Sequence, residues 1–496
     1  MEAQQGPSAC ADAVLQPEDV FDESVVEGPR RGLQKQLPAG PVGSASPSSG
    51  PPSSATGSFT EPDGSDAGEP SLLDERRRRI WVHGPRPEYK KYGQRYNLPA
   101  RVCSFLRPGL DVVILPGAHD LTREFWAFAS AELGLEAWQA VFTEGGRYNL
   151  DDDVSNNDAL VEALSSLVAG SGAWTLVPYC PTDNFNRWAS TLMQVNADVR
   201  VYGESLEWVE KYGHKGCLHR HVRNLDVPSV VEQVCGSNVV VAKGYTCSTI
   251  EHLLEAYRLL ECERVVIKPV FGAAGEGILF LKTEQELREY TFPMGDVCLE
   301  EHLDLDLAVD GICLSPALHY NEMNLLGNEC VDQIMNGVSY LGWRKSEVPE
   351  SFQAKAREGL LAFMRATCPR GPGGVDFLSV KGQPILSDLN TGRFNGAHTP
   401  KMFREMYAPG ASFYCWKGRT PENLTVHEFW KLLEEEGLAF HPNKSTEGVW
   451  PLLYLRGRSF MFVALSKEYE DCASMRTRTD AILERASEQL KAPPST

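Results

Sequence analysis

The sequence of 496 residues contains no run of 18 consecutive apolar residues, the length that a membrane-spanning helix requires. Its amino terminus lacks a basic segment followed by an apolar stretch, so it carries no recognisable secretory signal. The 13 cysteines are scattered from Cys10 to Cys472 without a CxxC pair, which argues against a zinc ribbon or a thioredoxin-like site. These absences predict a cytoplasmic protein with reduced thiols and no membrane partner.

Positive charge is also scarce. The chain has 48 Lys and Arg residues against 67 Asp and Glu residues, which gives a net charge of −19. The stretch up to Glu75 alone contains 13 acidic and only three basic residues. The remainder is mildly acidic, and this balance argues against nucleic acid as a partner, because surfaces that bind nucleic acid are basic.

The first 75 residues have few apolar side chains to bury. Residues 38–70 consist mainly of Pro, Gly, Ser and Ala, with Phe59 as their only aromatic residue. Such a segment cannot bury enough apolar surface to offset its chain entropy. We predict a disordered acidic tail over 1–75, domains over 76–225 and 226–470, and a polar, peripheral C-terminal helix and tail over 471–496.

Residues 76–225 alternate between strand and helix patterns. Apolar runs from Asp111 and from Trp174 predict buried strands, and residues 121–133 and 157–168 predict amphipathic helices. This alternation predicts a small parallel α/β domain, and the more numerous short strands of the following domain predict an α+β fold. In that second domain, strands are expected at 239–242, 265–268, 278–281, 297–299, 312–314, 375–380, 384–386, 450–455 and 460–465, and helices at 249–260, 284–290 and 350–366.

A glycine loop follows the strand that ends at Lys268. Gly272, Gly275 and Gly277 lie in this loop, and a second strand comes after it. Glycines let the backbone turn its N–H groups toward a phosphate, and the lysine places a positive charge beside the phosphate oxygens. No Gly-Lys-Ser/Thr follows, so this is not a Walker A loop, and a strand stands where a Rossmann motif begins a helix. A β-hairpin with flexible glycines is the alternative.

Residues on both sides of this loop extend the candidate nucleotide site. Upstream, Lys243 lies at the end of a predicted strand. Downstream, the segment from Glu300 to Leu303 follows another strand and can hydrogen-bond an adenine edge through its main chain, with Glu300 accepting from the exocyclic amine. Asp306 is placed to meet ribose hydroxyls. Taken alone, these acids equally fit a solvated loop.

The segment around Lys381-Gly382 predicts a β-hairpin that carries three oxygen ligands. Asp376 lies on its first strand, and Asp388 and Asn390 lie two residues apart on its second, so they point to one face. Two carboxylates and an amide oxygen suit Mg²⁺, which takes its other ligands from water and phosphate. Without a cation, two acids in an apolar hairpin repel each other. A solvent-facing strand is the alternative.

Together these segments resemble the ATP-grasp superfamily over about residues 210–470. A strand-end lysine, a lysine with a glycine loop, a Glu-Glu hinge and an Asp…Asp-x-Asn-x-x-Arg block occur in the order of that family. The preceding region resembles the pre-ATP-grasp domain of peptide-bond-forming ligases. The stretch from Trp208 to Gly216 resembles the linker between them, with Lys215 as its lysine. The resemblance implies a small parallel α/β domain followed by a two-lobed ATP-grasp fold.

The resemblance also implies the ligands of the site. Lys243 and Lys268 would contact the phosphates of ATP. Adenine would be held by Glu300, Glu301 and Leu303, and one or two Mg²⁺ ions, with Mn²⁺ as an alternative, by Asp376, Asp388 and Asn390. Two positions depart from the commoner pattern. Asp388 stands where glutamate is more frequent, and Leu305 replaces a glycine after the hinge, which leaves the ribose contact of Asp306 open.

The activity implied is the ATP-dependent joining of a small-molecule carboxylate to an amine, with amino acids or peptides as the expected substrates. The carboxylate would attack the γ-phosphate to give an acyl phosphate and ADP, and the amine would then displace phosphate. Metal and lysines would neutralise the anions that meet. Arg393 and Arg344 are the candidates for holding the acid or the acyl phosphate, and His398 and Lys401 could line the amine pocket.

Two other functions stay open on the sequence alone. A kinase of the same superfamily would use the same lysines and metal block to phosphorylate a hydroxyl, and it would form a stable phosphorylated product without an amine. A non-catalytic nucleotide-binding protein would bind nucleotide without Mg²⁺ and without turnover. The oligomeric state is likewise open.

Overall fold

The computed structural model describes residues 75–83, 98–117, 120–143, 150–170, 172–272, 275, 277–292, 295–327, 329–336 and 339–491. The tail predicted before residue 75 lies outside these ranges. No helix within the described ranges combines the length and the apolar character needed to cross a membrane.

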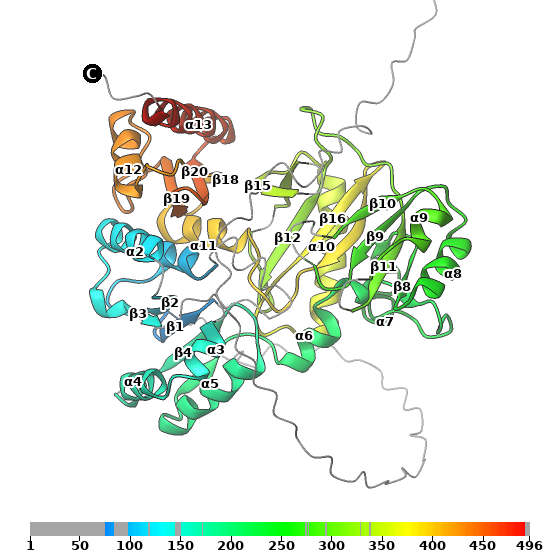
Figure 1. Ribbon diagram of the computed structural model, residues 1–496, viewed down its shortest axis with the longest axis horizontal. Helices are drawn as coiled ribbons and strands as arrows, with labels where there is room; N and C mark the ends of the chain where they lie inside the picture. The colour runs from blue at the N-terminus through cyan, green and yellow to red at the C-terminus, as the bar shows by residue number, and fades with distance from the viewer. Residues whose placement is uncertain are drawn as a thin grey trace, which may run out of the picture. The chain divides into compact units, whose positions relative to one another are not determined.

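The first sheet is the parallel sheet that the alternation of strands and helices predicts (Figure 1). Its strand order is β3-β2-β1-β4-β5, and every neighbouring pair is parallel. Successive residues of β2 enter two different apolar cores, because helices cover both faces of the sheet. The strands are β1 (Arg78–Val82), β2 (Val112–Pro116), β3 (Ala140–Thr143), β4 (Trp174–Pro178) and β5 (Val199–Val201). The helices are α2 (Asp120–Leu133), α3 (Leu150–Ser155), α4 (Asp158–Ala169) and α5 (Asp183–Val195).

The helix predicted at 157–168 is confirmed as α4, and its sequence explains both its start and its orientation. The Asn157 side chain accepts a hydrogen bond from the Leu160 N–H, which caps the first turn. Leu160, Leu164 and Val168 recur at helical spacing and are buried against the sheet.

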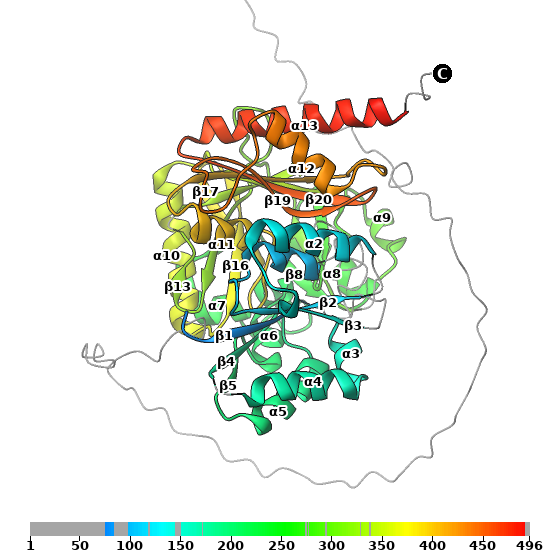
Figure 2. The same cartoon turned by 90° about the vertical axis from the view of Figure 1, so that its left-hand side faces the viewer.

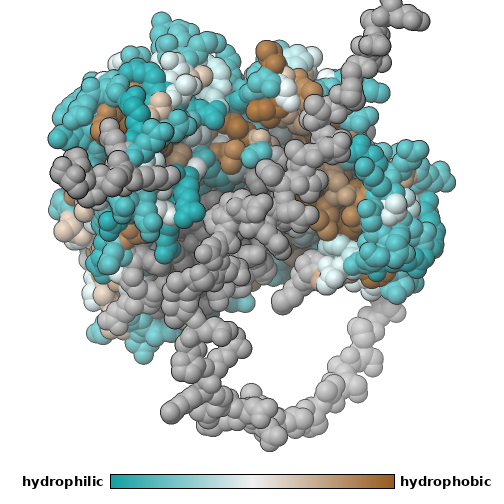
Figure 3. Space-filling model, turned by 45° about the horizontal axis from the view of Figure 1, so that its top comes forward, coloured by the Kyte–Doolittle hydropathy of each residue, from teal (hydrophilic) through white to brown (hydrophobic). Residues whose placement is uncertain are grey.

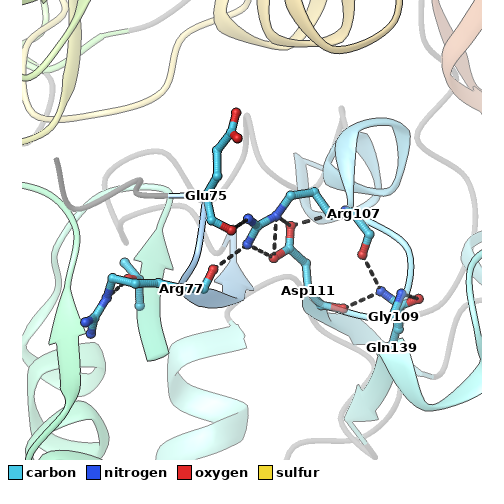
Figure 4. A network of polar contacts seen from close by, with 7 residues as sticks. Glu75, Arg77, Arg107, Gly109, Asp111 and Gln139 are labelled. Carbon is cyan, nitrogen blue, oxygen red and sulfur yellow. Dashed lines mark hydrogen bonds and ion pairs between the residues drawn. The ribbon is translucent and has the colours of Figure 1, made fainter. Parts of the chain in front are cut away.

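A buried ion pair anchors the loop that leads into β2 (Figure 4). Arg107 and Asp111 form a salt bridge of 2.6 Å, and Asp111 is fully buried. The same guanidinium donates to the main-chain carbonyl oxygens of Glu75 and Arg77, next to β1. Gln139 donates to the carbonyl oxygens of Arg107 and Asp111. One guanidinium therefore ties together the starts of two adjacent strands.

The second sheet contains the strand that ends in the glycine loop. Its order is β10-β9-β11-β8-β6, in which only β6 and β8 are parallel. Val265 and Ile267 enter the core beneath α8, whereas Val266, Lys268 and Glu300 face the opposite side. The elements are β6 (Arg220–His221), β8 (Gly244–Cys247), α8 (Ile250–Leu260), β9 (Val265–Pro269), β10 (Leu279–Leu281), α9 (Glu284–Arg288) and β11 (Val297–Glu301).

The third sheet contains the predicted metal hairpin. Its order is β19-β20-β18-β15-β14-β12-β16-β17-β7, and β13 pairs with β12 off this path. All its pairs are antiparallel except the short β7, which runs parallel to β17. The strands are β7 (Val240–Val241), β12 (Pro316–Asn321), β13 (Asn324–Leu325), β14 (Val331–Asn336), β15 (Ser339–Lys345), β16 (Pro372–Val380), β17 (Gln383–Leu389), β18 (Ser412–Gly418), β19 (Gly448–Leu455) and β20 (Ser459–Ser466). The remaining α-helices are α6 (Leu206–Tyr212), α7 (Val230–Cys235), α10 (Glu350–Thr367), α11 (His398–Tyr407), α12 (Val426–Glu435) and α13 (Tyr469–Lys491).

Two expectations about single elements are wrong. Residues 312–314 form no strand, and only an isolated bridge joins Cys313 to Leu307. The C-terminal helix was expected to be peripheral, but α13 inserts Ile482 and Leu483 into the largest apolar core. Its few apolar residues fall on one face, so a helix of polar composition still packs against the sheet.

The largest apolar core joins segments that are far apart in the sequence. The Phe128 ring on α2 lies 5.3 Å from the ring of Trp430 on α12 and 5.5 Å from that of Trp450 on β19, measured between centroids. Ser104, in the 3-10 helix Leu98–Phe105, donates to the Leu452 carbonyl and accepts from the Trp450 indole N–H. Figure 2 shows α2 beside these C-terminal elements. The core thus includes residues from both sides of the boundary expected at 225.

Glu204 connects the linker before α6 to the loop before β16. Its carboxylate accepts hydrogen bonds from the main-chain N–H groups of Arg370 and Gly371, at 2.6 Å and 2.9 Å. Burial raises the pKa of Glu204 to about 7, although these two hydrogen bonds oppose the rise. The folded protein therefore holds a proton here more tightly than the unfolded chain does.

We predict that Glu204→Gln stabilises the protein at alkaline but not at acidic pH. Between the unfolded pKa near 4.5 and the folded value near 7, the native state binds the extra proton, so wild-type stability falls as pH rises through this window. The variant lacks this loss and should gain about 2–3 kcal/mol at pH 8 relative to wild type. Urea unfolding at pH 5 and pH 8 measures the difference. The same gain in the exposed control Glu210→Gln, or a gain that is independent of pH, would contradict this role.

Candidate nucleotide and metal site

The predicted hairpin is confirmed, and it brings the two candidate metal carboxylates together. Asp376 on β16 lies directly opposite Asp388 on β17, beside a register shift in the pairing. The chain reverses at Lys381-Gly382, where both residues have positive φ. Directly opposed residues point to the same face of a sheet, so the two carboxylates face the same side.

Asn390 and Arg393 extend this pair into a chain of contacts. The Asn390 Nδ2 group donates to Asp376 Oδ2 at 2.7 Å, and the Arg393 guanidinium donates to Asn390 Oδ1. Arg393 is buried, so its charge acts on this cluster with little screening by water. All four residues of the predicted Asp…Asp-x-Asn-x-x-Arg block therefore gather at one place.

The electrostatics of the pair fit a cation. Burial and the neighbouring Asp388 raise the pKa of Asp376, and Lys215 and Arg393 only partly offset this. Asp376 Oδ1 is buried and has no hydrogen-bond partner among the residues that the structure describes. Within the described ranges, no three His, Cys, Asp or Glu side chains form a metal cage. The donor set is instead two carboxylates and one amide, which fits Mg²⁺ because that ion keeps water and phosphate as its other ligands.

Lys215 connects the metal hairpin to the glycine loop. Its Nζ lies 2.8 Å from Asp388 Oδ2 and donates to the carbonyl oxygen of Gly272 at 3.1 Å. The residue is only 7% exposed, so this contact between the second and third sheets is shielded from water. The sequence placed Lys215 in the linker and assigned it no contact. Its position in the stretch Trp208–Gly216 was the only signal available.

Lys268 and Glu300 form a second buried ion pair, on the face of the second sheet opposite α8. Lys268 Nζ lies 2.6 Å from Glu300 Oε2, and His219 Nε2 lies 3.0 Å from Glu300 Oε1. Burial alone would raise the pKa of Glu300, but Lys268 and His219 outweigh it and bring the pKa down to about 2. Glu300 thus fixes the position of Lys268 through its side chain. His219, which directly precedes β6, was not foreseen as a site residue.

The hinge after β11 is held by main-chain hydrogen bonds. Glu301 N–H donates to the Lys243 carbonyl at 2.9 Å, and the Lys243 N–H donates to the Glu301 carboxylate at 2.8 Å. The Lys243 side chain is exposed and its ammonium forms no ion pair within the described part of the chain. Leu303 follows as a half-buried residue. The hinge therefore presents an ordered backbone beside Lys268.

The glycine loop is described in part, since Ala273, Ala274 and Glu276 lie outside the described residues. Gly275 and Gly277 both have positive φ, a conformation that other residues adopt at a cost. A Cβ at Gly277 would also lie 2.6 Å from Pro269 Cγ. Glycine is therefore required where this loop returns to β10.

Two predicted site residues lie elsewhere. Asp306 accepts hydrogen bonds from the Ser379 hydroxyl and from the N–H groups of Lys381 and Gly382, so its carboxylate caps the turn of the metal hairpin and does not support a ribose contact. Arg344 lies opposite Asp332 and its guanidinium pairs with Asp310.

The register explains why Arg344 leaves the cluster. Gln333, which is close enough to Asp376 to lower its pKa, lies opposite Trp343. Arg344 is the next residue along the strand and points to the other face. A role in holding the acid substrate is therefore not supported for Arg344.

Phe280 is a residue that sequence patterns did not indicate. It lies on β10 directly opposite Val266, which in turn lies opposite Glu300, so its ring is on the face that carries Lys268. More than half of Phe280 is exposed. Figure 3 shows that hydrophobic residues reach the surface on the side of the molecule it presents. An exposed ring beside a buried lysine is suited to a ligand with a flat apolar part and an anionic part.

Comparison with known proteins supports the fold. The family model described as "Pre ATP-grasp domain" matches residues 100–194, within the first sheet and its helices. No curated protein matches the chain by sequence.

Three solved structures resemble the whole described unit. The carboxyaminoimidazole ribonucleotide synthase of Aspergillus clavatus complexed with ATP has 11% identity and a TM-score of 0.51, and the match covers 83% of this chain and 99% of that one. The N5-carboxyaminoimidazole synthase of the same organism, in complex with ADP and 5-aminoimidazole ribonucleotide, has 9% identity, a TM-score of 0.50, and coverage of 82% and 99%. The ADP complex of another N5-carboxyaminoimidazole ribonucleotide synthetase has 9% identity, a TM-score of 0.50, and coverage of 83% and 98%.

The predicted fold class is therefore confirmed. A small parallel α/β domain of pre-ATP-grasp type precedes an ATP-grasp fold, in which the second and third sheets face each other across Lys215 and the carboxylate pair.

We predict that Lys268→Met destabilises the fold, because it leaves the Glu300 carboxylate buried without its main partner. Breaking a buried pair from one side costs about 3 kcal/mol or more of unfolding free energy. Adding Glu300→Gln should recover part of that loss, since no uncompensated charge then remains. Chemical denaturation measures both. Lys243→Met is the matched control with an exposed lysine, and a Lys268→Met variant as stable as this control would contradict the prediction.

Proposed function

We propose that the protein is an ATP-dependent carboxylate–amine ligase that works through an acyl phosphate. The observation that carries the proposal is Lys215, whose buried ammonium contacts both the glycine loop at Gly272 and the metal carboxylate Asp388. A phosphate at the glycine loop and a cation at the carboxylates would then be immediate neighbours. Phosphoryl transfer requires this juxtaposition, because its catalysis rests on positioning and charge.

The nucleotide would lie on the face of the second sheet that carries Lys268. Lys268 and Lys215 would meet its phosphates, and Glu300 keeps Lys268 charged and in place. Phe280 and Val266 would contact the base, and the main-chain carbonyl of Glu301 would accept a hydrogen bond from its edge. The comparison structures with ATP and ADP have this same fold, which supports the assignment.

Asp376, Asp388 and Asn390 would hold Mg²⁺, and Mn²⁺ suits the same oxygen donors. When bound, the ion supplies positive charge to the phosphate oxygens. The side chains of the protein have separate tasks. Lys215 and Arg393 offset the negative charge of the two carboxylates, and Asn390 orients Asp376 through its amide.

In the proposed reaction the chain supplies no covalent nucleophile. A carboxylate oxygen of the acid substrate attacks the γ-phosphorus, ADP leaves, and an acyl phosphate forms. The amine then attacks the acyl carbon, phosphate leaves, and the amine loses a proton. Buried cations such as Lys215, Lys268 and Arg393 stabilise the charge that accumulates on the transferred group, as pre-organised charges do in a site shielded from water.

The acid and the amine are small molecules in this proposal. The comparison structure with 5-aminoimidazole ribonucleotide contains a ligand of another class, so it lends no support to amino acids or peptides as substrates. A screen of substrates should therefore cover small carboxylates and amines broadly.

We predict that purified protein releases ADP from Mg-ATP only with a particular acid and amine together. Asp388→Ala should lower this release by at least about 10²-fold, because it removes a metal carboxylate. A coupled assay of ADP across pairs of small carboxylates and amines measures it. Release of ADP with an acid alone, giving a stable phosphorylated product, would refute the ligase.

A second prediction separates Lys215 from Lys243. Lys215→Met should lower kcat by about 10²-fold, because a buried charge at the transferred phosphate is lost. Lys243→Met should change kcat much less, since its ammonium is exposed and forms no ion pair in the described ranges. Steady-state kinetics on the two variants tests this, and equal losses would show that Lys215 has no special role.

A further inference from the structure

Three N–H groups near the metal carboxylates have no hydrogen-bond acceptor among the described residues. They are His319 Nε2 on β12, Trp343 Nε1 on β15, and Asn395 Nδ2 in the segment between β17 and α11. All three atoms are buried, and His319 and Trp343 are at most 3% exposed as whole residues. A buried donor without an acceptor lowers the stability of the fold by about 1–3 kcal/mol. Three such donors close together therefore indicate a binding site for a ligand that accepts hydrogen bonds.

Ring contacts and two glycines bring these donors to one place. The His319 and Trp343 rings lie 5.1 Å apart, edge to face. A Cβ at Gly374 would lie 2.7 Å from Asn395 Nδ2 and 2.8 Å from His319 Cδ2. A Cβ at Gly396 would lie 3.1 Å from Trp343 Nε1. Because neither glycine carries a side chain, no Cβ crowds these donors.

Lys401 determines which atom of His319 carries the proton. Its Nζ lies 3.2 Å from His319 Nδ1 and donates to the Leu326 carbonyl at 3.0 Å. When Lys401 is charged its ammonium can only donate, so Nδ1 is then the acceptor and Nε2 holds the hydrogen. Burial and the nearby Lys401 keep the pKa of His319 well below its usual range, so the ring stays neutral.

The charged form of Lys401 makes the local charge positive. Lys401 is 2% exposed, and no carboxylate of the described residues pairs with it. Burial, followed by Arg404, lowers the pKa of Lys401 to about 7. An anion in front of His319 would stabilise the charged form of this lysine. A ligand that accepts several N–H bonds and carries negative charge therefore fits the cluster better than water does.

The cluster lies next to the metal carboxylates. Gly374 pairs with His319, and Asp376 pairs with Ala317 two residues along the same two strands. Residues two apart on a strand share a face and are about 7 Å apart. A carboxylate held by the donors would thus stand two residues along the strands from the proposed metal, where an acid must be to attack the γ-phosphate.

We propose that His319 Nε2, Trp343 Nε1 and Asn395 Nδ2 form the seat for the carboxylate of the acid substrate. The identity of the ligand as a substrate rests on the proposed ligase function, but its binding requires neither nucleotide nor metal. His398 and Lys401, considered above as amine-pocket residues, both contact His319 and hold its ring in position.

The test is a titration of the full chain with sodium acetate, followed by the indole N–H signals in ¹⁵N-tryptophan NMR spectra. The Trp343 signal is identified by its absence in Trp343→Phe. Trp430 is the matched control, because its indole N–H is equally buried and also lacks an acceptor but lies on α12. Acetate should move the Trp343 signal saturably and downfield and leave the Trp430 signal in place.

Two variants and two control solutes test whether the shift reports carboxylate binding at these donors. Asn395→Asp replaces a donor by a charged acceptor and should abolish the acetate shift. Lys401→Met should weaken acetate binding severalfold. This second variant tests the proposal if Asn395→Asp does not fold. Sodium chloride and acetamide should not move the signal.

If acetate does not change the chemical shift of the Trp343 indole N–H, the proposal is overturned. An equal shift with chloride or acetamide, or a shift with inorganic phosphate alone, would also overturn it. Acetate binding is independent of ADP release, so each of the two proposals can fail without the other.

Discussion

Two like charges in a buried hairpin are the constraint around which the site is built. Asp376 and Asp388 face each other across neighbouring strands, and Asp388 together with burial raises the pKa of Asp376. Lys215, in the linker, offsets this repulsion by forming a salt bridge with Asp388. Arg393 places a second positive charge nearby through its hydrogen bond to Asn390. The linker, the glycine loop and the hairpin are therefore brought together by a shared electrostatic need. Polar residues so deep in a fold would otherwise weaken it.

Much of the fold could be foreseen because its signals are local. The alternating strands and helices before residue 225 have periodicities that direct them to opposite faces of a parallel sheet, and the cap at Asn157 marks the start of its helix. The β16–β17 hairpin followed from its turn residues and from the spacing of its acids. The strand wrongly expected at 312–314 shows the limit of local signals. Residues 312–314 have the apolar character of a strand, but they make only isolated hydrogen bonds to residues 306–308 and to Ser379 and no continuous ladder, and pairing is a property of the whole sheet.

The site was foreseen only where a motif lies within one segment. Lys268 and the carboxylate block come from continuous stretches, and their residue types suggest the chemistry. Lys215, His219 and Phe280 act through partners that are remote in the sequence, and no spacing reveals that such residues meet. The prediction that Arg344 holds the acid substrate failed for a related reason. Alternate side chains of a strand point to opposite faces of the sheet, and the pairing of β15 with β14 determines which face Arg344 is on.

The shared core of α2, α12 and β19 has a consequence for how the chain is made. The apolar side of α2, including Phe128, is completed by Trp430 and Trp450, which lie more than 300 residues further along the chain. During synthesis that surface exists before its partners have left the ribosome. The first sheet can form early, but the face that carries α2 stays open until Trp430 and Trp450 have been made. Contacts of such long range slow folding, and exposed apolar surface favours aggregation, so this part of the nascent chain is prone to aggregate until those partners emerge.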